Sequence, residues 1–365
     1  MNEQHLPTKA GQVPQGQGQK YLTIKLGLDV HADSIVVVRI LDNTAPQPAQ
    51  KFSEEGFLEW VKKQLKEAQV VHSCYEAGPF GYGLHRRLID LGVKNVVVQP
   101  VCLDERRTGV NHDKSDAQEL SMRLDRYVAG NTKSLAIVRV PTPEEEQRRV
   151  VTRQREQLTR ERKRLAAQGR GLMLAQGFRE KGQWWRGARW KVLAGRLPEW
   201  LRQALERYQR MLACVEEERD RIDGELESRP QGARPKGMGP LTSEVVDREV
   251  GDWRRFKNRR QVGSYTGLCG GVSSSGLSHR QLSVTKHGNV RLRTALVELA
   301  WRMVVYQPQS RLVQKWRPVF GNPRATAGAR KKAIVAMARQ MAVDLWRWKT
   351  GRAKPEDLGW VMMEA

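Results

Sequence analysis

The chain has 365 residues, of which 64 are lysine or arginine and 40 are aspartate or glutamate, so its net charge is +24. This excess favours a polyanionic partner, either nucleic acid or an anionic membrane surface, over a role in which charge only keeps the protein soluble. No run of about 20 apolar residues is present, so we expect no membrane-spanning helix.

Residues 1–20 are rich in Gln, Gly and Pro and lack the apolar core of a signal peptide, which predicts a disordered tail. The cysteines contain no CxxC pair, so we expect neither a zinc site nor a disulfide framework; they are Cys74, Cys102, Cys214 and Cys269. Scattered cysteines of this kind favour a reducing, cytoplasmic setting.

Strand and helix patterns alternate in the first third of the chain after an opening hairpin. In chain order they are strands Tyr21–Asp29 and Ile35–Leu41, helix Phe57–Leu65, strand Val70–Tyr75, helix Leu84–Leu91, strand Asn95–Gln99 and helix Asp113–Tyr127. This alternation predicts an α/β domain over residues 21–135.

The middle third predicts a helical segment over residues 140–230. Thr142 and Glu145 form a capping box with Pro143 at the first helical position, and a long Arg-rich helix follows to about Gln168. From Leu201 to Leu226, apolar residues recur at alternating spacings of four and three, with one missed position at Arg219. This pattern is typical of a coiled coil between two chains or of a helical hairpin within one chain, and the spacing does not separate the two.

Between these helices lies an unusual aromatic and basic segment, QWWRGARW. Aromatic rings and guanidinium groups together suit RNA bases and phosphates, which makes Trp184, Trp185 and Arg186 candidate nucleic-acid contacts. A solvent-facing loop with a small aromatic cluster is the alternative interpretation.

The last third begins after a boundary rich in proline and glycine at Arg229–Gly239. A Gly/Ser-rich loop is expected at Gly267–Gly276, with helices over Asn289–Val305 and Ala333–Trp346. These patterns predict a mainly α-helical domain over residues 231–350 and a tail over residues 351–365.

Four acids of the first domain are placed where a metal site is expected. Asp29 and Glu76 end predicted strands, and Asp113 and Asp116 share one face of a helix because they are three residues apart. Carboxylate oxygens suit two Mg²⁺ ions, or Mn²⁺, which assist phosphoryl transfer when they lie about 4 Å apart. Taken singly, each acid is equally a helix cap or a surface charge.

The sequence LGLDVH at Leu26–His31, with YEAGPFGYGLHRRL from Tyr75 and NHDKSDA from Asn111, resembles the DEDD transposases of insertion sequences. The resemblance implies a RuvC-like, RNase H-type first domain in which these four acids are the metal ligands. It also implies a central coiled-coil segment and a mainly α C-terminal transposase domain.

The C-terminal third resembles the second domain of the same family in KGMGPLTSEVV, RRFKNRRQVGSYTGL and SSSGLSHRQLSVTKHGNVRLR. In that family the serine before a glycine is the nucleophile, which corresponds to Ser275, with Ser274 as the alternative register. Cations after the serine are candidate phosphate contacts, namely Arg280, Lys286, Arg291 and Arg293.

The resemblance implies a bacterial, nucleoid-associated recombinase that cleaves, exchanges and religates DNA through a phosphoserine intermediate. Its partners would be donor and target DNA, a structured guide RNA encoded by the element, and further copies of itself, as a dimer that becomes a tetramer on DNA.

Two other functions fit the same residues. One is a RuvC-like junction nuclease that uses water, and the other is a non-catalytic nucleic-acid-binding assembly protein. Metal-dependent cleavage and a covalent protein–DNA adduct separate the three.

Overall fold

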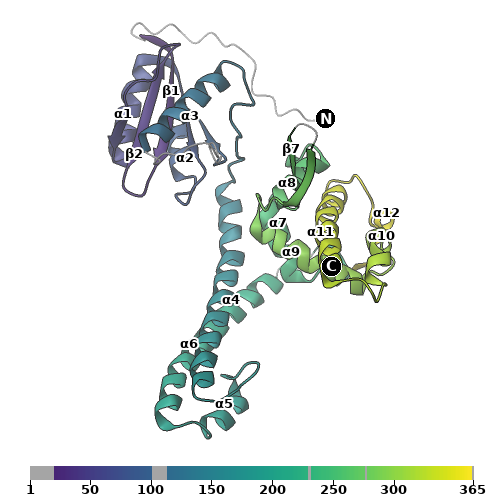
Figure 1. Cartoon of the computed structure of the whole chain (residues 1–365). Helices are drawn as coiled ribbons and strands as arrows, with labels where there is room; N and C mark the ends of the chain where they lie inside the picture. Colours follow the sequence, from purple (N-terminus) through teal and green to yellow (C-terminus); the bar gives the residue numbers. More distant parts are fainter. Residues whose placement is uncertain (1–19, 101–112, 229–231, 276–277, 364–365) are drawn as a thin grey trace. The chain divides into compact units, whose positions relative to one another are not determined.

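The computed structural model describes residues 20–100, 113–228, 232–275 and 278–363 (Figure 1). The chain divides into two compact units, residues 1–140 and residues 141–365, which we describe separately. Apart from Lys20, the predicted N-terminal tail lies outside the described residues. No helix of the described residues is long and apolar enough to cross a membrane.

The first unit contains a five-stranded mixed sheet. Its strands are β1 (Tyr21–Val30), β2 (Ile35–Leu41), β3 (Gln50–Phe52), β4 (Ala68–Glu76) and β5 (Lys94–Val98), in the spatial order β3-β2-β1-β4-β5. The first three strands are antiparallel neighbours, whereas β4 and β5 run parallel to β1. The expected α/β architecture of this region is confirmed, and β3 is an addition that the sequence pattern did not predict.

Alternation along β1 separates the two faces of this sheet. Ile24, Leu26 and Leu28 are buried on the face covered by α1 (Glu54–Glu67) and α2 (Gly83–Asp90). The opposite face carries α3 (Asp113–Val128), which crosses β1 at Gly27. A Cβ atom on Gly27 would lie 2.3 Å from both the Ala117 carbonyl oxygen and the Ser121 nitrogen, so only glycine admits the helix this close.

Helices α4 (Pro143–Ala175), α5 (Gly187–Ala194) and α6 (Glu199–Glu227) form an extended part of the second unit, which we call the arm. The predicted capping box is present, because Thr142 accepts a hydrogen bond from the Glu145 amide and Glu145 from that of Thr142. Figure 1 shows α4 and α6 side by side, with α5 in their connection. Leu201, Leu205 and Leu212 are buried in a core that α4 completes. The apolar seam is therefore used within one chain, as a helical hairpin.

The rest of the second unit is mainly helical, in agreement with the expectation. Its elements are β6 (Arg234–Pro235), α7 (Pro240–Val250), a 3-10 turn (Trp253–Arg255), α8 (Arg259–Thr266), β7 (Gly270–Ser275), β8 (Ser278–Val284), α9 (Val290–Tyr306), α10 (Arg311–Phe320), α11 (Ala327–Lys349), α12 (Pro355–Leu358) and β9 (Met362–Met363). Helices α9 and α11 supply most of the buried apolar core, including Leu299, Met303 and Met337.

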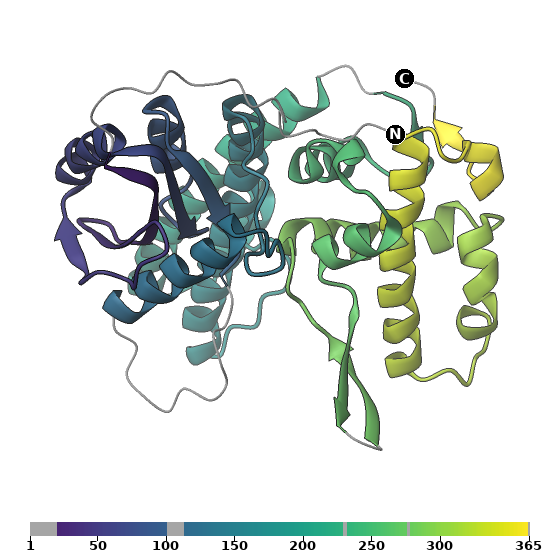
Figure 2. The same cartoon turned by 90° about the horizontal axis from the view of Figure 1, so that it is seen from above.

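One expectation for this unit is corrected. The Gly/Ser-rich segment that was predicted as a loop forms β7, which pairs antiparallel with β8 from Gly270 opposite Val284 to Ser275 opposite Ser278. Figure 2 shows this hairpin extending away from the helices. The finer boundaries predicted at residues 135, 140, 230 and 350 stay predictions.

Candidate functional site

Two of the predicted acids occupy the same edge of the sheet. Asp29 is the penultimate residue of β1 and Glu76 is the last residue of β4, and these parallel neighbours are in register at Leu28 and Tyr75. Lys25 and Gly27 precede Asp29 on the face that carries α3, and Cys74 precedes Glu76 on the same face, with its thiol 3.5 Å from the Leu120 carbonyl oxygen. Strand alternation therefore directs both acids toward the α3 side.

The direction of α3 brings its N-terminus to this edge. Lys25 Nζ donates to Asp125 Oδ1 at 2.6 Å, while Gly27 lies under Ala117 and Ser121, so α3 runs opposite to β1. The four residues from Lys25 to Asp29 span about 13 Å of strand, and the nine from Asp125 back to Asp116 span about 13 Å of helix. Asp116 is therefore level with Asp29, and Asp113 begins the same helix one turn earlier.

The described side chains around this edge include a histidine and a buried cysteine. His31 Nε2 lies 3.0 Å from Asp29 Oδ2, a contact that the sequence pattern does not predict. Burial and, to a smaller extent, the Glu76 carboxylate raise the pKa of the Cys74 thiol, so Cys74 is protonated at neutral pH. No three His, Cys, Asp or Glu side chains of the described part are gathered closely enough to hold a metal ion. The Asp113 side chain lies outside that part.

The predicted nucleophile lies at the end of the β7–β8 hairpin. Ser275 is the last residue of β7 and pairs with Ser278, and Ser274 pairs with His279. The side chains of both serines lie outside the described residues. The pairing thus puts both serines at the end of the hairpin that lies far from the helices that hold its base.

The base of this hairpin is tightly built. Gly267 takes a φ of 66°, and a Cβ on Gly288 would lie 2.5 Å from the Gly267 nitrogen. Arg293 donates to the carbonyl oxygens of Lys286 at 3.1 Å and Thr266 at 3.3 Å. Arg293 therefore holds the two strands where they leave the helices.

The other predicted phosphate contacts differ in their surroundings. Arg280 and Lys286 are exposed. Arg291 is half-buried and its Nε donates to Glu156 of α4 at 2.5 Å. Arg291 and Arg293 thus have partners within the unit, and contact with phosphate by any of the four stays a prediction.

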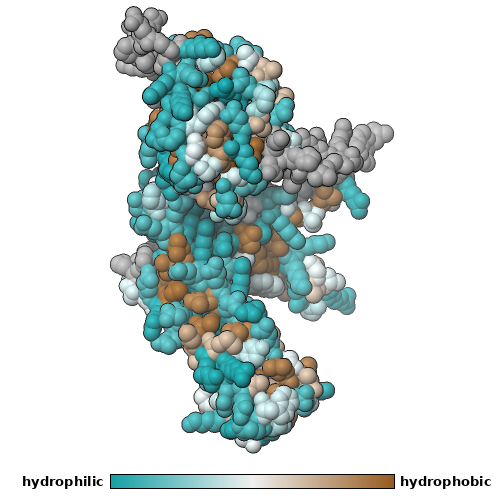
Figure 3. Space-filling model, turned by 90° about the vertical axis from the view of Figure 1, so that its left-hand side faces the viewer, coloured by the Kyte–Doolittle hydropathy of each residue, from teal (hydrophilic) through white to brown (hydrophobic). Residues whose placement is uncertain are grey.

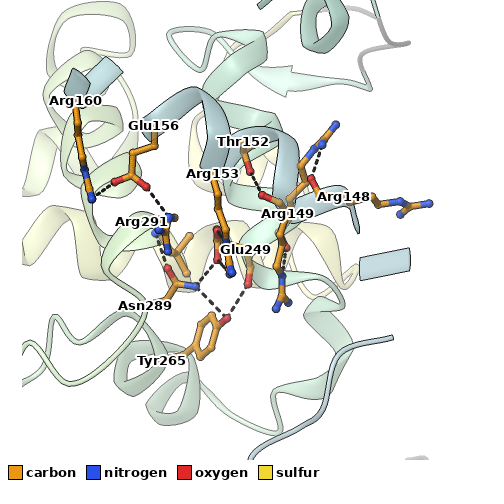
Figure 4. Close-up of polar contacts among 12 residues, drawn as sticks. Arg148, Arg149, Thr152, Arg153, Glu156, Arg160, Glu249, Tyr265, Asn289 and Arg291 are labelled. Atoms are coloured by element: carbon orange, nitrogen blue, oxygen red, sulfur yellow. Dashed lines mark hydrogen bonds and ion pairs between the residues drawn. The ribbon is translucent and has the colours of Figure 1, made fainter. Parts of the chain in front are cut away.

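A buried acid joins α4, α7 and α8 to the N-cap residue of α9 (Figure 4). Glu249 of α7 is 1% exposed and accepts from Arg153 of α4 at 3.2 and 3.3 Å and from Asn289 at 2.8 Å. Tyr265 of α8 donates to the Glu249 carbonyl oxygen at 2.7 Å. Burial by itself favours the neutral acid, but the hydrogen bonds from Arg153 and Asn289 hold the pKa of Glu249 below its ordinary value. No spacing of residues in the sequence predicts this cluster, because its members are far apart in the chain.

The predicted aromatic contacts with nucleic acid are corrected. Trp184 is fully buried, its indole N–H donates to the Ala166 carbonyl oxygen at 3.1 Å, and a Cβ on Gly169 would lie 2.2 Å from its ring. Trp185 is also buried and donates to Glu216 at 3.1 Å. Both rings pack the end of the arm, so neither offers a face for stacking on a base. Arg186 is about half exposed and pairs with Glu216 at 3.0 Å, so its contact with nucleic acid stays a prediction.

Residues 233–314, which include the hairpin, match the sequence profile of the family described as "Transposase IS116/IS110/IS902 family". A protein of Sinorhizobium fredii named as a transposase (y4rJ) is 33% identical over 303 residues, in an alignment that covers 75% of each chain. The transposase for insertion sequence element IS1533 of Leptospira borgpetersenii is 24% identical over 87% of this chain and 95% of its own. The transposase for IS1111A of Coxiella burnetii is 26% identical over 80% and 84%.

Proposed function

Because this chain belongs to the IS116/IS110/IS902 family of transposases, we propose that it recombines DNA by Mg²⁺-dependent cleavage, exchange and religation through a phosphoserine intermediate. The observation that carries the proposal is the edge of the first unit's sheet, where Asp29, Glu76 and the start of α3 converge. The strand order β3-β2-β1-β4-β5, with three antiparallel and two parallel strands, supports a RuvC-like, RNase H-type domain.

Asp29, Glu76, Asp113 and Asp116 would hold two Mg²⁺ ions, or Mn²⁺. Their donor type fits, because hard divalent cations prefer carboxylate oxygens, and the strand ends and the helix start that carry the four acids support a common edge. Bound there, the ions would supply the positive charge that stabilises phosphoryl transfer. The chain's own part is to orient the carboxylates, and the contact between His31 and Asp29 serves that orientation.

Ser275 is the proposed nucleophile. Its hydroxyl oxygen attacks a phosphorus of the DNA backbone and loses its proton, a P–O bond to the serine forms, and one P–O bond to a deoxyribose breaks and leaves a free hydroxyl. A deoxyribose hydroxyl of another strand then attacks the phosphoserine and releases the serine. The number of phosphoester bonds is unchanged, so religation needs no nucleotide cofactor.

The proposed partners are donor and target DNA, a structured RNA encoded by the element, and further copies of the chain, as a dimer that becomes a tetramer on DNA. The net charge of +24 supports polyanionic partners. A guide RNA that reads sequence by base pairing would leave the protein to recognise mainly backbone and shape, as in other guided systems.

The experiment that tests the serine is denaturing electrophoresis of labelled DNA with wild type, Ser274→Ala and Ser275→Ala. We expect Ser275→Ala to bind nucleic acid as the wild type does but to form no protein–DNA adduct and no recombinant. Removing the hydroxyl takes away the attacking atom, so adduct formation should fall below detection.

Two other results have definite meanings. Loss of the adduct in Ser274→Ala alone would move the nucleophile by one residue. An adduct that survives both substitutions, or cleavage without any adduct in the wild type, would overturn the serine mechanism and leave a nuclease that uses water at the carboxylate edge.

A further inference from the structure

The positive charge of this transposase is concentrated in one stretch of the second unit. Between Trp253 and Val343 the sequence has 18 arginine or lysine residues, and Glu298 is the only acid. The hairpin and its base use some of these cations. Those of α10, α11 and the turn between them have no part in the mechanism proposed above.

Five of the unused cations form a group that we call the α10–α11 ridge: Arg317, Arg324, Lys331, Lys332 and Arg339. All five are exposed, and none forms an ion pair with any residue that the structure describes. The arm differs in that several of its exposed arginines pair with neighbouring acids, for example Arg164 with Glu161 at 2.7 Å and Arg221 with Glu217 at 2.6 Å. The ridge is therefore positive charge that the protein itself does not compensate.

Three of the five cations of the ridge belong to α11. Lys331 and Lys332 lie in its first turns, and Arg339 follows seven and eight residues later, which places the three side chains on one face. A Cβ on Gly263 of α8 would lie 3.1 Å from Arg339 Nε, and α8 leads into β7. The ridge therefore reaches the base of the β7–β8 hairpin, about 12 Å along the helix from Lys331.

The other end of the ridge lies in the turn between α10 and α11. Before that turn, Arg317 of α10 lines a shallow depression with Gln314, Pro318 and Asn322. The first turn of α11 contains no acid, and cations follow it, which opposes the usual preference for negative charge at a helix N-terminus. In Figure 2 this turn and the hairpin extend to the same side of the unit.

We propose that the α10–α11 ridge is a second binding surface for the phosphodiester backbone of a nucleic acid, separate from the hairpin. Exposed, unpaired cations along a rigid helix suit regularly spaced phosphates, which are bound without regard to sequence. DNA and RNA share this chemistry, and the experiment distinguishes them. The inference rests on the proposed function only in taking nucleic acid as the partner, and not in the serine or metal chemistry.

The test compares the variant Arg317→Gln/Lys331→Gln/Lys332→Gln with the wild type, as full-length proteins. Binding to labelled duplex DNA, single-stranded DNA and a hairpin RNA is measured by fluorescence anisotropy at several salt concentrations. For duplex DNA each lost phosphate contact removes about 0.9 from the slope of log K against log salt, so the slope should fall by about 2 to 3 and the affinity by about tenfold or more at low salt. A change confined to one probe identifies the nucleic acid that the ridge binds.

The matched control is Arg164→Gln/Arg202→Gln/Arg221→Gln in the arm, which changes the net charge equally but removes cations that already have acidic partners. It should leave the slope unchanged. An equal effect of both triple variants would attribute binding to net charge, and no effect of the ridge variant on any probe would point to another class of partner, such as an acidic protein; either result overturns the proposal. Ser275→Ala is assayed alongside, and its failure to lose the adduct would bear on the serine mechanism and not on the ridge.

Discussion

Asp116 is the acid of the carboxylate edge whose level is best defined, because the Lys25–Asp125 contact and Gly27 fix α3 against β1. We predict that Asp116→Asn lowers Mg²⁺-dependent cleavage by about 100-fold or more, since metal ions supply several kcal/mol of transition-state stabilisation. The measurement is single-turnover cleavage at several Mg²⁺ concentrations. Thermal unfolding with and without Mg²⁺ gives a second readout, in which the variant should lose stabilisation by the ion.

The control for this prediction is Asp33→Asn, an exposed acid in the turn after β1. It makes the same chemical change close to the site and should leave both cleavage and the Mg²⁺ effect intact. Wild-type cleavage by Asp116→Asn and by Asp29→Asn would remove the metal role from this edge.

Glu249 contributes to the stability of the folded protein, and its substitution should lower the free energy of unfolding. Glu249→Gln keeps the shape of the side chain but leaves the Arg153 guanidinium without its buried anionic partner. Breaking a fully buried pair costs about 3–5 kcal/mol, and we expect about 1–3 kcal/mol here because Arg153 is partly exposed. Denaturant unfolding at neutral pH measures the loss.

The contribution of Glu249 to stability should depend on pH. Because the pKa of Glu249 is lower in the folded protein than its ordinary value of 4.5, its ionised form contributes stability above that pH. This contribution is lost as the pH falls through the folded-state pKa. The variant should therefore differ from the wild type most above pH 4.5 and converge with it in acid. A difference that grows toward acid pH would contradict this role.

Among the elements, those with strong local patterns were predicted well. The periodicity of β1, β2, β4 and α3 and the capping box at Thr142 each follow from neighbours in sequence, and the structure has all of them. The three-residue strand β3 and the strand β7 owe their existence to pairing with another strand. Glycine and serine in β7 give no strand signal of their own.

Some residues of the candidate site could likewise be predicted from local sequence, whereas the surroundings of others depend on tertiary packing. The positions of Asp29 and Glu76 follow from where their strands end, so the sequence placed them correctly at one edge. The burial of Trp184 depends on Gly169, a residue of a different element whose missing side chain makes room for the ring. The Glu249 cluster likewise joins residues of three helices and the N-cap residue of a fourth. Such contacts depend on tertiary packing, and no periodicity within one element reports them.

The arm shows why an apolar seam does not identify its own partner. Leu205 is fully buried against residues of the same chain, including Leu165 of α4. We predict that Leu205→Asp unfolds the arm, at a cost of about 3 kcal/mol or more, because it removes a core side chain and buries a charge. Circular dichroism and thermal unfolding measure the loss, and sedimentation measures the oligomeric state.

The control on the same helix is Met211→Asp, since Met211 is largely exposed. It should leave the arm folded. If Leu205→Asp gave a fully folded monomer from a wild-type dimer, the seam would be an interface between chains.

The apolar side chains that do reach the surface of the arm include Leu174, Val192 and Trp200, and Figure 3 shows hydrophobic patches at its lower end. A dimer that uses the arm would have to use such exposed residues instead of the seam.

At the scale of the whole molecule, charge is distributed unevenly. The arm balances many of its cations with acids, whereas the stretch from Trp253 to Val343 does not. A single-signed surface of this size binds polyanions by releasing their counterions, so affinity should fall steeply with salt. In the proposed function this surface binds two kinds of polyanion, DNA and RNA. A functional RNA must therefore be distinguished experimentally from RNA that is bound through charge alone.

We predict that the transposase co-purifies with one discrete RNA encoded by its own element. Charge alone would retain a mixture in proportion to cellular abundance, whereas a guide is selected by its fold and should be enriched far above that mixture. Sequencing of RNA extracted after a high-salt wash measures the enrichment. Ribonuclease treatment should abolish recombination, and the transcribed RNA should restore it when added back. Ser275→Ala serves as the control, because it should retain the same RNA while forming no adduct. Recovery of bulk cellular RNA only, together with recombination that survives ribonuclease, would show that the protein selects its DNA sites without a guide.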